Sequence, residues 1–549
     1  MLSPLNDDFK FKVKIDIIAK KSKKEEFLDK TRQIAGSEFY IDRGDKFEYK
    51  KRQVVIGNLN GRNSDYNYYV FNLPYKWSDD KRQTDKFFKF IEEEPKIKFV
   101  TPNLRGDQAK ISWLNEAMNK ITNPKEGLDL KPVNEKIKDF IFDSSKAEEI
   151  YKNLSKDEEE WNELKRHELL ILNDSQRKAV LSALNCTDLA LLQGPPGTGK
   201  TTVIAEMIWQ MVRVNQEQKI LLTSETNLAV DNALEKLLNK NHTLVKPIRF
   251  GRASKFEEEG KKYAFERIMK WVDEKFETDD NYENEVLEED DVEIVEEDFY
   301  NNSVQLWMRR IANNSQQSNP KYSDIMKDWA FEMAQPDKEM KTLFKDKYFK
   351  YANVVGSTSS SAGSPNFGAD YQRIFNDYEG ELEIGQLYKR AKNLSKKHIG
   401  FNGWYKGTNL LEVIKPIEFD TVITDEASKA TPPELLLPMC FGRKNIIIGD
   451  HRQLPPMLHD KTFKETLESL ETTESKELAS EIDKDFVETS QFERLIMHPK
   501  VSTTIKSTFN EQYRMHPKIN NVIKQFYLDE GGLEPGKPIK ENANDTNLN

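Results

Sequence analysis

A glycine-rich loop lies between an apolar run and a helical pattern near the middle of the sequence. The apolar run is LALLQ at 189–193, and the helical pattern is TTVIAEMIWQMV at 201–212. The residues from Gly194 to Thr201 match G-x-x-x-x-G-K-[ST], a pattern whose backbone N–H groups surround phosphate oxygens. The first turn of a helix adds unpaired N–H groups and a partial positive charge, which also favour an anion. The order of strand, loop and helix therefore predicts a phosphate-binding loop.

Two side chains in this loop suit a nucleoside triphosphate with magnesium. We expect the Lys200 amine to reach the β- and γ-phosphates of ATP and the Thr201 hydroxyl to bind Mg²⁺. The predicted nucleotide-binding residues here are Gly194, Pro195, Pro196, Gly197, Thr198, Gly199, Lys200, Thr201 and Thr202. The predicted cofactors are therefore ATP and Mg²⁺.

A pair of carboxylates, Asp425 and Glu426, follows a second apolar run, TVIT. ATP hydrolysis needs a further metal ligand and a group that positions water. We expect Asp425 to hold Mg²⁺ through water and Glu426 to polarise the attacking water. Such a pair by itself also suits a solvated helix start, so this prediction depends on the phosphate-binding loop elsewhere in the chain.

Two glutamines complete the candidates that the residue types suggest. Gln453, in HRQLPPM after the run NIIIGD, has an uncharged amide that can sense the γ-phosphate. Gln176, in LNDSQRKAV upstream of the loop, has an amide that can bind the edge of adenine. Either glutamine alone is equally typical of a surface position.

The candidate residues stand at the ends of short apolar runs, which the fold must bring together. These runs are DLALLQG, KILLTS, ANVVGST, DTVITDE and NIIIGD, and helical stretches separate several of them. Buried parallel strands have such a composition, and ligands bind at their carboxyl ends. We therefore predict an α/β domain with a parallel sheet from residues 173–255 and 351–484, interrupted by a helical insertion at 256–350.

The N-terminal region has a different pattern. Stretches such as FKFKVKIDII and YNYYVFNLP alternate with turn signals, which predicts a β-rich accessory domain at 1–135. Residues 136–172 are charged and helically periodic and predict a helical stalk. Lysines interleaved with Phe and Tyr in the accessory domain suit either a nucleic-acid backbone or a solvated basic face.

Length and composition limit the classes of protein to which this chain can belong. A chain of 549 residues is long enough for several domains, and no apolar run is long enough to span a membrane, so we expect a cytoplasmic protein. The net charge of −10 comes from residues 277–298, which hold thirteen acids and no Lys or Arg, so the remainder is about +3. Such a run suits a solvated loop or, alternatively, a mimic of a phosphate backbone. The two cysteines support neither a disulfide framework nor a zinc site.

Eight motifs follow one another between residues 173 and 528. They are LNDSQ, GPPGTGKT, SETNLAVDNAL, VVGST, DEAS, GDHRQLPP, SQFERL and QYRMHP. Together they resemble the superfamily 1 helicases, in particular the branch of the nonsense-mediated-decay RNA helicase and its DNA-acting relatives. Many ATPases share the phosphate loop, whereas GDHRQLPP with QYRMHP is close to diagnostic for this branch. The resemblance implies a RecA-like, doubly wound P-loop NTPase domain that acts on single-stranded RNA or DNA.

The resemblance also implies roles for residues that spacing alone does not identify. Tyr513 is expected to stack on the adenine, and Arg514 is expected to contact the γ-phosphate from a second RecA-like domain. Thr226, Asn227 and Thr358 match family positions that touch the nucleic-acid backbone. Short hydroxyl and amide side chains suit such contacts, although they are equally suited to capping the helices that follow them.

The sequence departs from the family after QYRMHP. The glycine- and glutamine-containing loop and the late finger arginine of the family's second domain are missing, so we expect residues 485–549 to be the incomplete start of that domain. We expect the missing C-terminal RecA-like portion in cis or as a separate chain. The predicted function is an ATP-dependent helicase or translocase. The alternative is an ATP-switched nucleic-acid-binding or scaffold protein, in a nuclease or defence complex, that does not unwind.

Overall fold

The computed structural model divides into two compact units, Met1–Ile111 and Ser112–Asn549. It describes the strand backbones of the first unit and most of the second unit with its side chains. The described ranges are 2–5, 10–14, 38–42, 53–59, 68–72, 100–102, 105–125, 128–149, 158–237, 243–251, 253, 256–273, 302–318, 336–396, 403–456 and 489–536. Among these residues, no helix is both long and apolar enough to cross a membrane.

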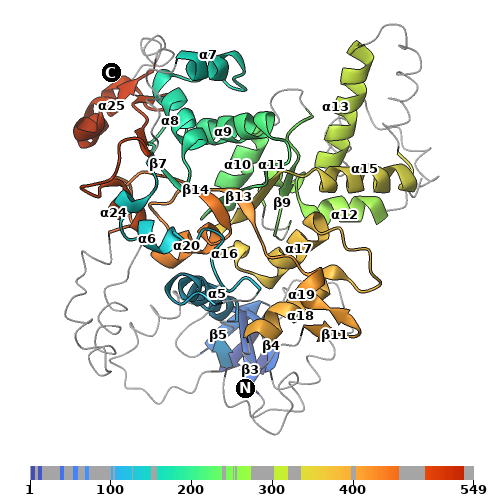
Figure 1. The fold of residues 1–549 in the computed structure, drawn as a ribbon. Helices are drawn as coiled ribbons and strands as arrows, with labels where there is room; N and C mark the ends of the chain where they lie inside the picture. The colour runs from blue at the N-terminus through green and yellow to red at the C-terminus, as the bar shows by residue number, and fades with distance from the viewer. Residues whose placement is uncertain are drawn as a thin grey trace, which may run out of the picture. The chain divides into compact units, whose positions relative to one another are not determined.

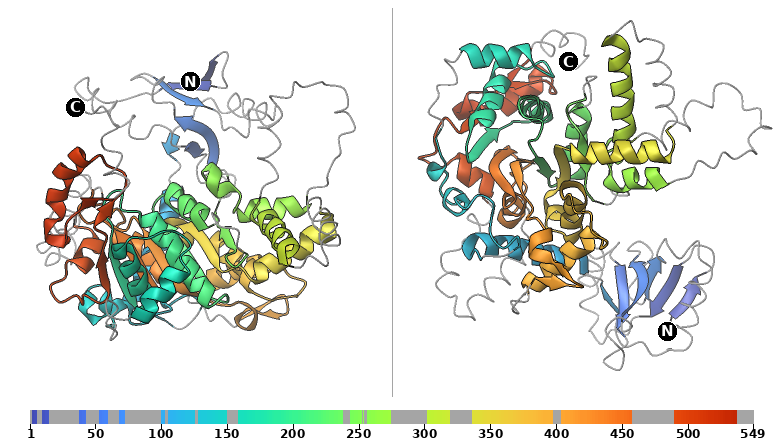
Figure 2. Two further views of the ribbon diagram at one scale, coloured as in Figure 1. Left: turned by 90° about the horizontal axis from the view of Figure 1, so that it is seen from above. Right: turned by 45° about the vertical axis from the view of Figure 1, so that its right-hand side comes forward.

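An antiparallel sheet makes up the first unit and is drawn in blue in Figure 2. Its six strands have the order β1-β2-β5-β4-β3-β6. The strands are β1 (Leu2–Leu5), β2 (Lys10–Lys14), β3 (Glu38–Asp42), β4 (Gln53–Leu59), β5 (Tyr68–Asn72) and β6 (Val100–Pro102), followed by α5 (Arg105–Thr122). This sheet agrees with the predicted β-rich region. The lysine side chains of the strands lie outside the described residues, so both interpretations of them stay predictions.

A parallel sheet of seven strands forms the centre of the second unit (Figure 1). Its order is β15-β7-β14-β13-β8-β10-β9, and every neighbouring pair is parallel. The strands are β7 (Leu189–Gln193), β8 (Ile220–Ser224), β9 (Pro247–Arg249), β10 (Val354–Thr358), β13 (Phe419–Asp425), β14 (Gly442–Gly449) and β15 (Lys506–Thr508). The prediction of a buried parallel sheet is confirmed, because each of the five apolar runs forms one of these strands.

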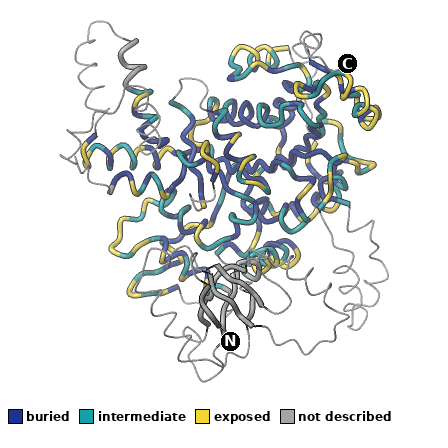
Figure 3. Tube along the Cα trace, turned by 180° about the vertical axis from the view of Figure 1, so that it is seen from behind, coloured by how far each residue is buried: buried dark blue, intermediate teal, exposed yellow. Residues whose placement is uncertain are grey.

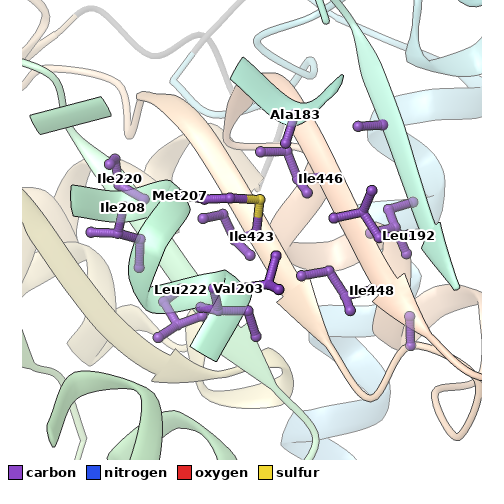
Figure 4. Packing of buried hydrophobic residues seen from close by; sticks show 14 of the residues in the cluster. Ala183, Leu192, Val203, Met207, Ile208, Ile220, Leu222, Ile423, Ile446 and Ile448 are labelled. Atoms are coloured by element: carbon purple, nitrogen blue, oxygen red, sulfur yellow. The ribbon is translucent and has the colours of Figure 1, made fainter. Parts of the chain in front are cut away.

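Helices cover both faces of this sheet, and the alternation of side chains along the strands divides the core in two. On β8, Leu222 packs in one apolar cluster and Leu221 in the other, as a period of two residues requires. Figure 4 shows the first cluster, in which Val203, Met207 and Ile208 of α9 (Lys200–Val214) pack over the strands. Apart from the half-buried β15, the strands of the sheet are mostly buried, and dark blue segments accordingly fill the centre of the second unit in Figure 3. This packing fixes the strand ends that carry the candidate residues.

The other helices and strands connect or extend this framework. They are α6 (Ile137–Phe140), η2 (Ser144–Lys146), α7 (Glu158–Arg166), α8 (Asp174–Asn185), α10 (Asn227–Leu237), α16 (Ser359–Ala362), α17 (Pro365–Phe375), α18 (Ile384–Lys396), β11 (Trp404–Tyr405), β12 (Thr408–Asn409), α19 (Leu410–Val413) and α20 (Pro432–Met439). The segment predicted as a stalk contains the short α6, η2 and α7. Phe140 of α6 is fully buried in the core of the second unit.

The region predicted as a helical insertion is mostly helical where the structure describes it. It contains α11 (Glu258–Lys261), α12 (Phe265–Asp273), α13 (Ser303–Ser318) and α15 (Lys338–Lys350). Trp307 packs on Tyr348 with ring centroids 5.7 Å apart, and the Tyr348 hydroxyl donates to the carbonyl of Pro247 on β9 at 2.9 Å. The insertion is thereby joined to the edge of the sheet. The acidic run at 277–298 lies outside the described residues.

The C-terminal segment differs from the prediction of a separate second domain. It contains α24 (Gln491–Ile496), β15, β16 (Glu511–Gln512), α25 (Pro517–Ile523), η6 (Lys524–Glu530) and β17 (Glu534–Pro535). β15 adds to the first sheet beside β7, and the buried Ile505 and Phe509 flank it. Because β15 has only three half-buried residues, KST, it lacks the apolar run by which five of the other strands were predicted.

Candidate nucleotide-binding site

The phosphate-binding loop connects β7 to α9 and depends on two glycines in the left-handed region. Gly197 has a φ of +76°, and Gly199, which precedes the first turn of α9, has a φ of +81°. A side chain is strained in this region. A Cβ at 197 would lie 2.7 Å from Cβ of Arg514, and one at 199 would lie 2.7 Å from Nε2 of Gln176. The glycines thus allow distant parts of the chain to contact the loop.

Lys200 is the first helical residue after the loop. Its Nζ donates to the carbonyl of Gly194 at 2.7 Å, so the side chain curls back over the loop. Burial lowers the pKa of Lys200, and the nearby carboxylates, Asp425 foremost, oppose this shift. An ammonium group has three N–H donors, so the same group can bind phosphate oxygens as well.

A cavity of about 1250 Å³ opens beside the loop. Such a volume accommodates a nucleotide, since ligand pockets typically measure about 300 to 1,000 Å³. The predicted site residues that line it are Gln176, Pro196, Gly197, Thr198, Gly199, Lys200, Thr201, Thr202, Thr226, Asp425, Glu426, Gln453, Tyr513 and Arg514. Gly194, Pro195, Asn227 and Thr358 are predicted site residues outside this lining.

The predicted metal ligand Asp425 and the predicted catalytic residue Glu426 differ in their surroundings. Asp425, at the end of β13, is buried and accepts a hydrogen bond from the backbone N–H of Glu426 at 2.8 Å. Burial raises the pKa of Asp425, while the charge of Lys200 lowers it. Glu426 has a φ of +54°, which is unusual for a residue with a side chain. Its carboxylate pairs with Nζ of Lys429 at 3.2 Å and accepts from the Thr226 hydroxyl at 3.4 Å.

Gln453 lines the cavity from the loop after β14. Its Nε2 donates to Asp450 at 2.8 Å, and Asp450 also accepts from Gln193 of β7 at 2.6 Å and from the Tyr527 hydroxyl of η6 at 2.8 Å. Asp450 is buried and connects three segments far apart in the sequence. The predicted sensor Gln453 is therefore linked through Asp450 to both the loop-bearing strand and the C-terminal segment.

Gln176 lies between a helix cap and the phosphate loop. Its Oε1 accepts from the backbone N–H of Asn173 at 2.9 Å, and its Nε2 donates to the carbonyl of Thr198 at 2.8 Å. Asn173 in turn caps α8 and donates from Nδ2 to the Tyr513 hydroxyl at 2.8 Å. Both ends of the Gln176 amide are thus bonded within the protein. The contact of Gln176 with adenine stays a prediction.

QYRMHP contacts the loop directly. The backbone N–H of Tyr513 donates to the carbonyl of Gly197 at 2.8 Å, and the side chains of Tyr513 and Arg514 line the cavity. These residues were predicted to approach from a second domain. In the structure they belong to the same compact unit as the loop, because β15, just before them, is paired with β7.

Comparison with known proteins finds similarity over the part of the chain that forms this site. A family model described as an AAA domain matches residues 171–372 and 406–461. The relatives include an uncharacterised ATP-dependent helicase of Methanocaldococcus jannaschii, 28% identical over 304 residues that cover 54% of this chain and 39% of the relative. The DNA polymerase alpha-associated DNA helicase A of Saccharomyces cerevisiae is 26% identical, with 55% of this chain and 35% of the relative covered.

Residues 171–372 and 406–461 are thus similar to the ATPase domains of proteins that are named as helicases. This similarity agrees with the resemblance to superfamily 1 helicases that the motifs indicated. The DNA replication ATP-dependent helicase/nuclease DNA2 of Saccharomyces cerevisiae, 25% identical over 52% of this chain, also matches, with 11% of its own length covered. The chain thus spans well under half the length of these three relatives.

The three residues predicted to contact nucleic acid lie near the ends of two neighbouring strands, β8 and β10, but have different hydrogen-bond partners. Thr226 lines the nucleotide cavity and contacts Glu426. The side-chain oxygen of Asn227 accepts from Nη2 of the buried Arg249 at 2.8 Å, and the Thr358 hydroxyl donates to that of Ser361 at 2.7 Å. All three stand at or just beyond the carboxyl end of β8 or β10. Only Thr226 is joined by a hydrogen bond to a predicted catalytic residue.

Several residues that line the cavity were not predicted from the sequence. Leu228, Asn232 and Lys236 line it from one face of α10, and Asn173 and Lys429 also belong to the lining. The spacing of four residues along α10 was a readable signal, because positions i, i+4 and i+8 share a helix face. No local pattern indicates which structure that face meets.

Proposed function

We propose that this chain is the ATP-hydrolysing part of a helicase or translocase that moves along single-stranded RNA or DNA. The observation that carries the proposal is the hydrogen bond from Thr226 to Glu426. It links a predicted nucleic-acid contact to the predicted catalytic carboxylate, beside the loop that holds Lys200. The names of the relatives as helicases support the same activity.

Magnesium fits the donor set of this cavity. The Thr201 hydroxyl and the buried Asp425 carboxylate both line it, and Mg²⁺ takes oxygen ligands. Among the described residues there is no group of three or more His, Cys, Asp or Glu side chains that would hold a metal alone. Such a site suits an ion that takes its other ligands from phosphate and water, as Mg²⁺ does. When bound, the ion would neutralise charge that develops on the phosphates.

Side chains of the protein would bind the nucleotide and position the attacking water. Lys200 would bind the β- and γ-phosphates, and Glu426 would position and polarise the attacking water. Gln453 would sense the γ-phosphate through an amide that Asp450 orients. Tyr513 would stack on the adenine, with its hydroxyl held by Asn173.

Nucleic acid would bind near the carboxyl ends of β8 and β10, where the residues predicted to contact it lie. Thr226, Asn227 and Thr358 are short polar residues, which suit backbone contacts that do not read the base sequence. Because such contacts do not distinguish the 2′-hydroxyl, we propose RNA and DNA equally as substrates.

A further RecA-like portion, in cis or as a separate chain, would supply the finger arginine. An arginine at the γ-phosphate increases turnover by about 10³ to 10⁵ in comparable enzymes. We expect residues 1–549 alone to bind ATP and to hydrolyse it slowly. We also propose that the protein works in the cytoplasm.

A strand-displacement experiment tests this function. The chain, with and without an added C-terminal portion, is mixed with a tailed RNA or DNA duplex, ATP and Mg²⁺, and both strand release and ATP turnover are measured. With the C-terminal portion added, we expect turnover stimulated by nucleic acid together with strand release, whereas the chain alone should hydrolyse ATP slowly. Glu426→Gln should bind ATP normally and lose turnover, whereas Lys200→Ala should lose binding.

Each other outcome has a distinct meaning. ATP turnover without strand release or movement along the strand would overturn the motor and indicate the alternative, an ATP-switched binding or scaffold protein. Full turnover in Glu426→Gln or Lys200→Ala would overturn the site itself.

A further inference from the structure

Lys236, near the end of α10, brings a positive charge to the wall of the nucleotide cavity. Its Nζ donates to Oγ1 of Thr202 at 2.7 Å. Thr202 stands in the first turn of α9, two residues after Lys200. The ammonium group therefore lies beside the first turn of the helix that follows the phosphate-binding loop.

No carboxylate balances this charge in the part of the chain that the structure describes. Lys429, in the same cavity, pairs with Glu426 at 3.2 Å, but Lys236 has only the Thr202 hydroxyl as its side-chain partner there. Burial lowers the pKa of the Lys236 amine. A partly buried ammonium without a counter-charge is unfavourable, and an approaching anion relieves that cost. The position is therefore prepared for an anionic ligand.

We infer that Lys236 binds the α-phosphate of the nucleotide, an inference that rests on the proposed ATP site. The loop N–H groups surround the α- and β-phosphates, and the loop lysine reaches the β- and γ-phosphates. Thr202 follows both Lys200 and the metal-binding Thr201 along α9, which places its hydroxyl away from the γ-phosphate. An ammonium group has three N–H donors, so Lys236 can keep its bond to Thr202 and donate to a phosphate oxygen.

Lys236→Met in the 549-residue chain tests this assignment. The dissociation constants of ATP and ADP, each with Mg²⁺, are measured by calorimetry. We expect both constants to rise by about 10- to 100-fold, because a hydrogen bond between charged groups is lost. The two factors should be equal, since both nucleotides carry the α-phosphate. AMP, which has no β-phosphate, should lose affinity by the same factor, and an unchanged affinity for AMP would place the contact on the β-phosphate. Lys236→Arg should retain most of the affinity.

Lys178→Met is the matched control, because it removes one positive charge from an exposed position of α8, outside the cavity lining. Its affinity for both nucleotides should equal that of the unaltered chain. The melting temperature of each variant is measured to verify folding. If Lys236→Met does not fold, Lys236→Gln replaces it with the same expected loss.

Three further results would overturn the inference. Unchanged ATP and ADP affinity in Lys236→Met would mean that the residue does not bind the nucleotide. A loss of affinity for ATP alone would mean that Lys236 contacts the γ-phosphate instead. If Lys236→Met lowers the affinity for ADP but not for 2′-deoxy-ADP, Lys236 contacts the ribose hydroxyl instead. Failure of the proposed site itself is distinguishable, because the unaltered chain would then bind neither nucleotide.

Discussion

At Gly197, both the backbone conformation and the close approach of another residue require glycine. The loop needs a φ of +76° there, and the approach of Arg514 leaves no room for a methyl group. Glu426 meets a related demand without being glycine, since its φ of +54° places a side chain in a sparsely populated region at the predicted catalytic position. Glu426 thus has a strained backbone conformation at a position where the predicted chemistry requires a carboxylate.

Replacing Gly197 with alanine should reduce nucleotide binding. The new Cβ would lie 2.7 Å from Cβ of Arg514, so the loop or the QYRMHP segment must shift. Gly531→Ala is the matched control, because Gly531 has a φ of +94° and a Cβ there meets nothing within 4 Å. We expect Gly531→Ala to lose about 1 to 2 kcal/mol of stability from backbone strain alone and to keep its ATP affinity.

Titration with ATP and urea unfolding of both variants measure this difference. Equal ATP affinity in the two variants would show that the approach of Arg514 does not shape the loop.

At the scale of elements, the N-cap residue of α8 has a second role besides starting the helix. Asn173 accepts from the backbone N–H of Gln176 at 2.9 Å and forms a reciprocal capping box with it. The same side chain donates to the Tyr513 hydroxyl, 340 residues later. A helix cap, the phosphate loop and the predicted adenine-stacking residue are therefore connected by consecutive hydrogen bonds.

Two substitutions of Asn173 separate these roles. Asn173→Ala removes both the cap and the contact with Tyr513, and should cost about 1 kcal/mol of stability. Asn173→Ser keeps a capping oxygen but is too short to replace the amide donor, so its stability should stay close to that of the unaltered chain. Both should weaken ATP binding by a similar factor. Urea unfolding and ATP titration check this, and normal ATP binding in Asn173→Ser would exclude a role for the Tyr513 contact.

At the scale of the whole ATPase unit, the C-terminal segment is attached by charge as well as by β15. Glu530 of η6 pairs with Nε2 of His451 at 2.9 Å and with Nε of Arg452 at 3.0 Å. Burial by itself would raise the pKa of Glu530, but the hydrogen bonds and charges of His451 and Arg452 lower it overall. These contacts join the predicted sensor loop to the segment that carries Arg514.

This pair predicts a pH dependence of stability. A carboxylate whose pKa is lowered by folding contributes stability above its unfolded pKa of about 4.3, and loses that contribution as pH falls through the folded value. We therefore expect Glu530→Gln to be less stable than the unaltered chain at pH 7. Because His451 is charged only when protonated, the decisive range lies below about pH 5, where the difference should shrink as Glu530 becomes protonated. Urea unfolding in this range measures it, and a difference that grows as pH falls below about 5 would contradict the assignment.

The local patterns of the sequence were sufficient for the phosphate loop, the Asp425-Glu426 pair and the parallel sheet. Each depends on residues adjacent in the chain: apolar runs make buried strands, and a glycine-rich turn before a helix makes an anion site whatever surrounds it. The order of the motifs was likewise sufficient for the family. These features were predictable because short-range backbone geometry and burial determine them.

Only the tertiary structure decided which distant side chains meet. It placed β15 in the first sheet, bonded Gln176 to Thr198, joined Thr226 to Glu426 and brought Lys236 to Thr202. A half-buried strand such as KST is stabilised by the neighbour with which it pairs, and a lysine on a helix face looks the same in sequence whether it meets water or a phosphate-binding loop. Those outcomes depend on packing between segments tens to hundreds of residues apart, and no local pattern records that packing.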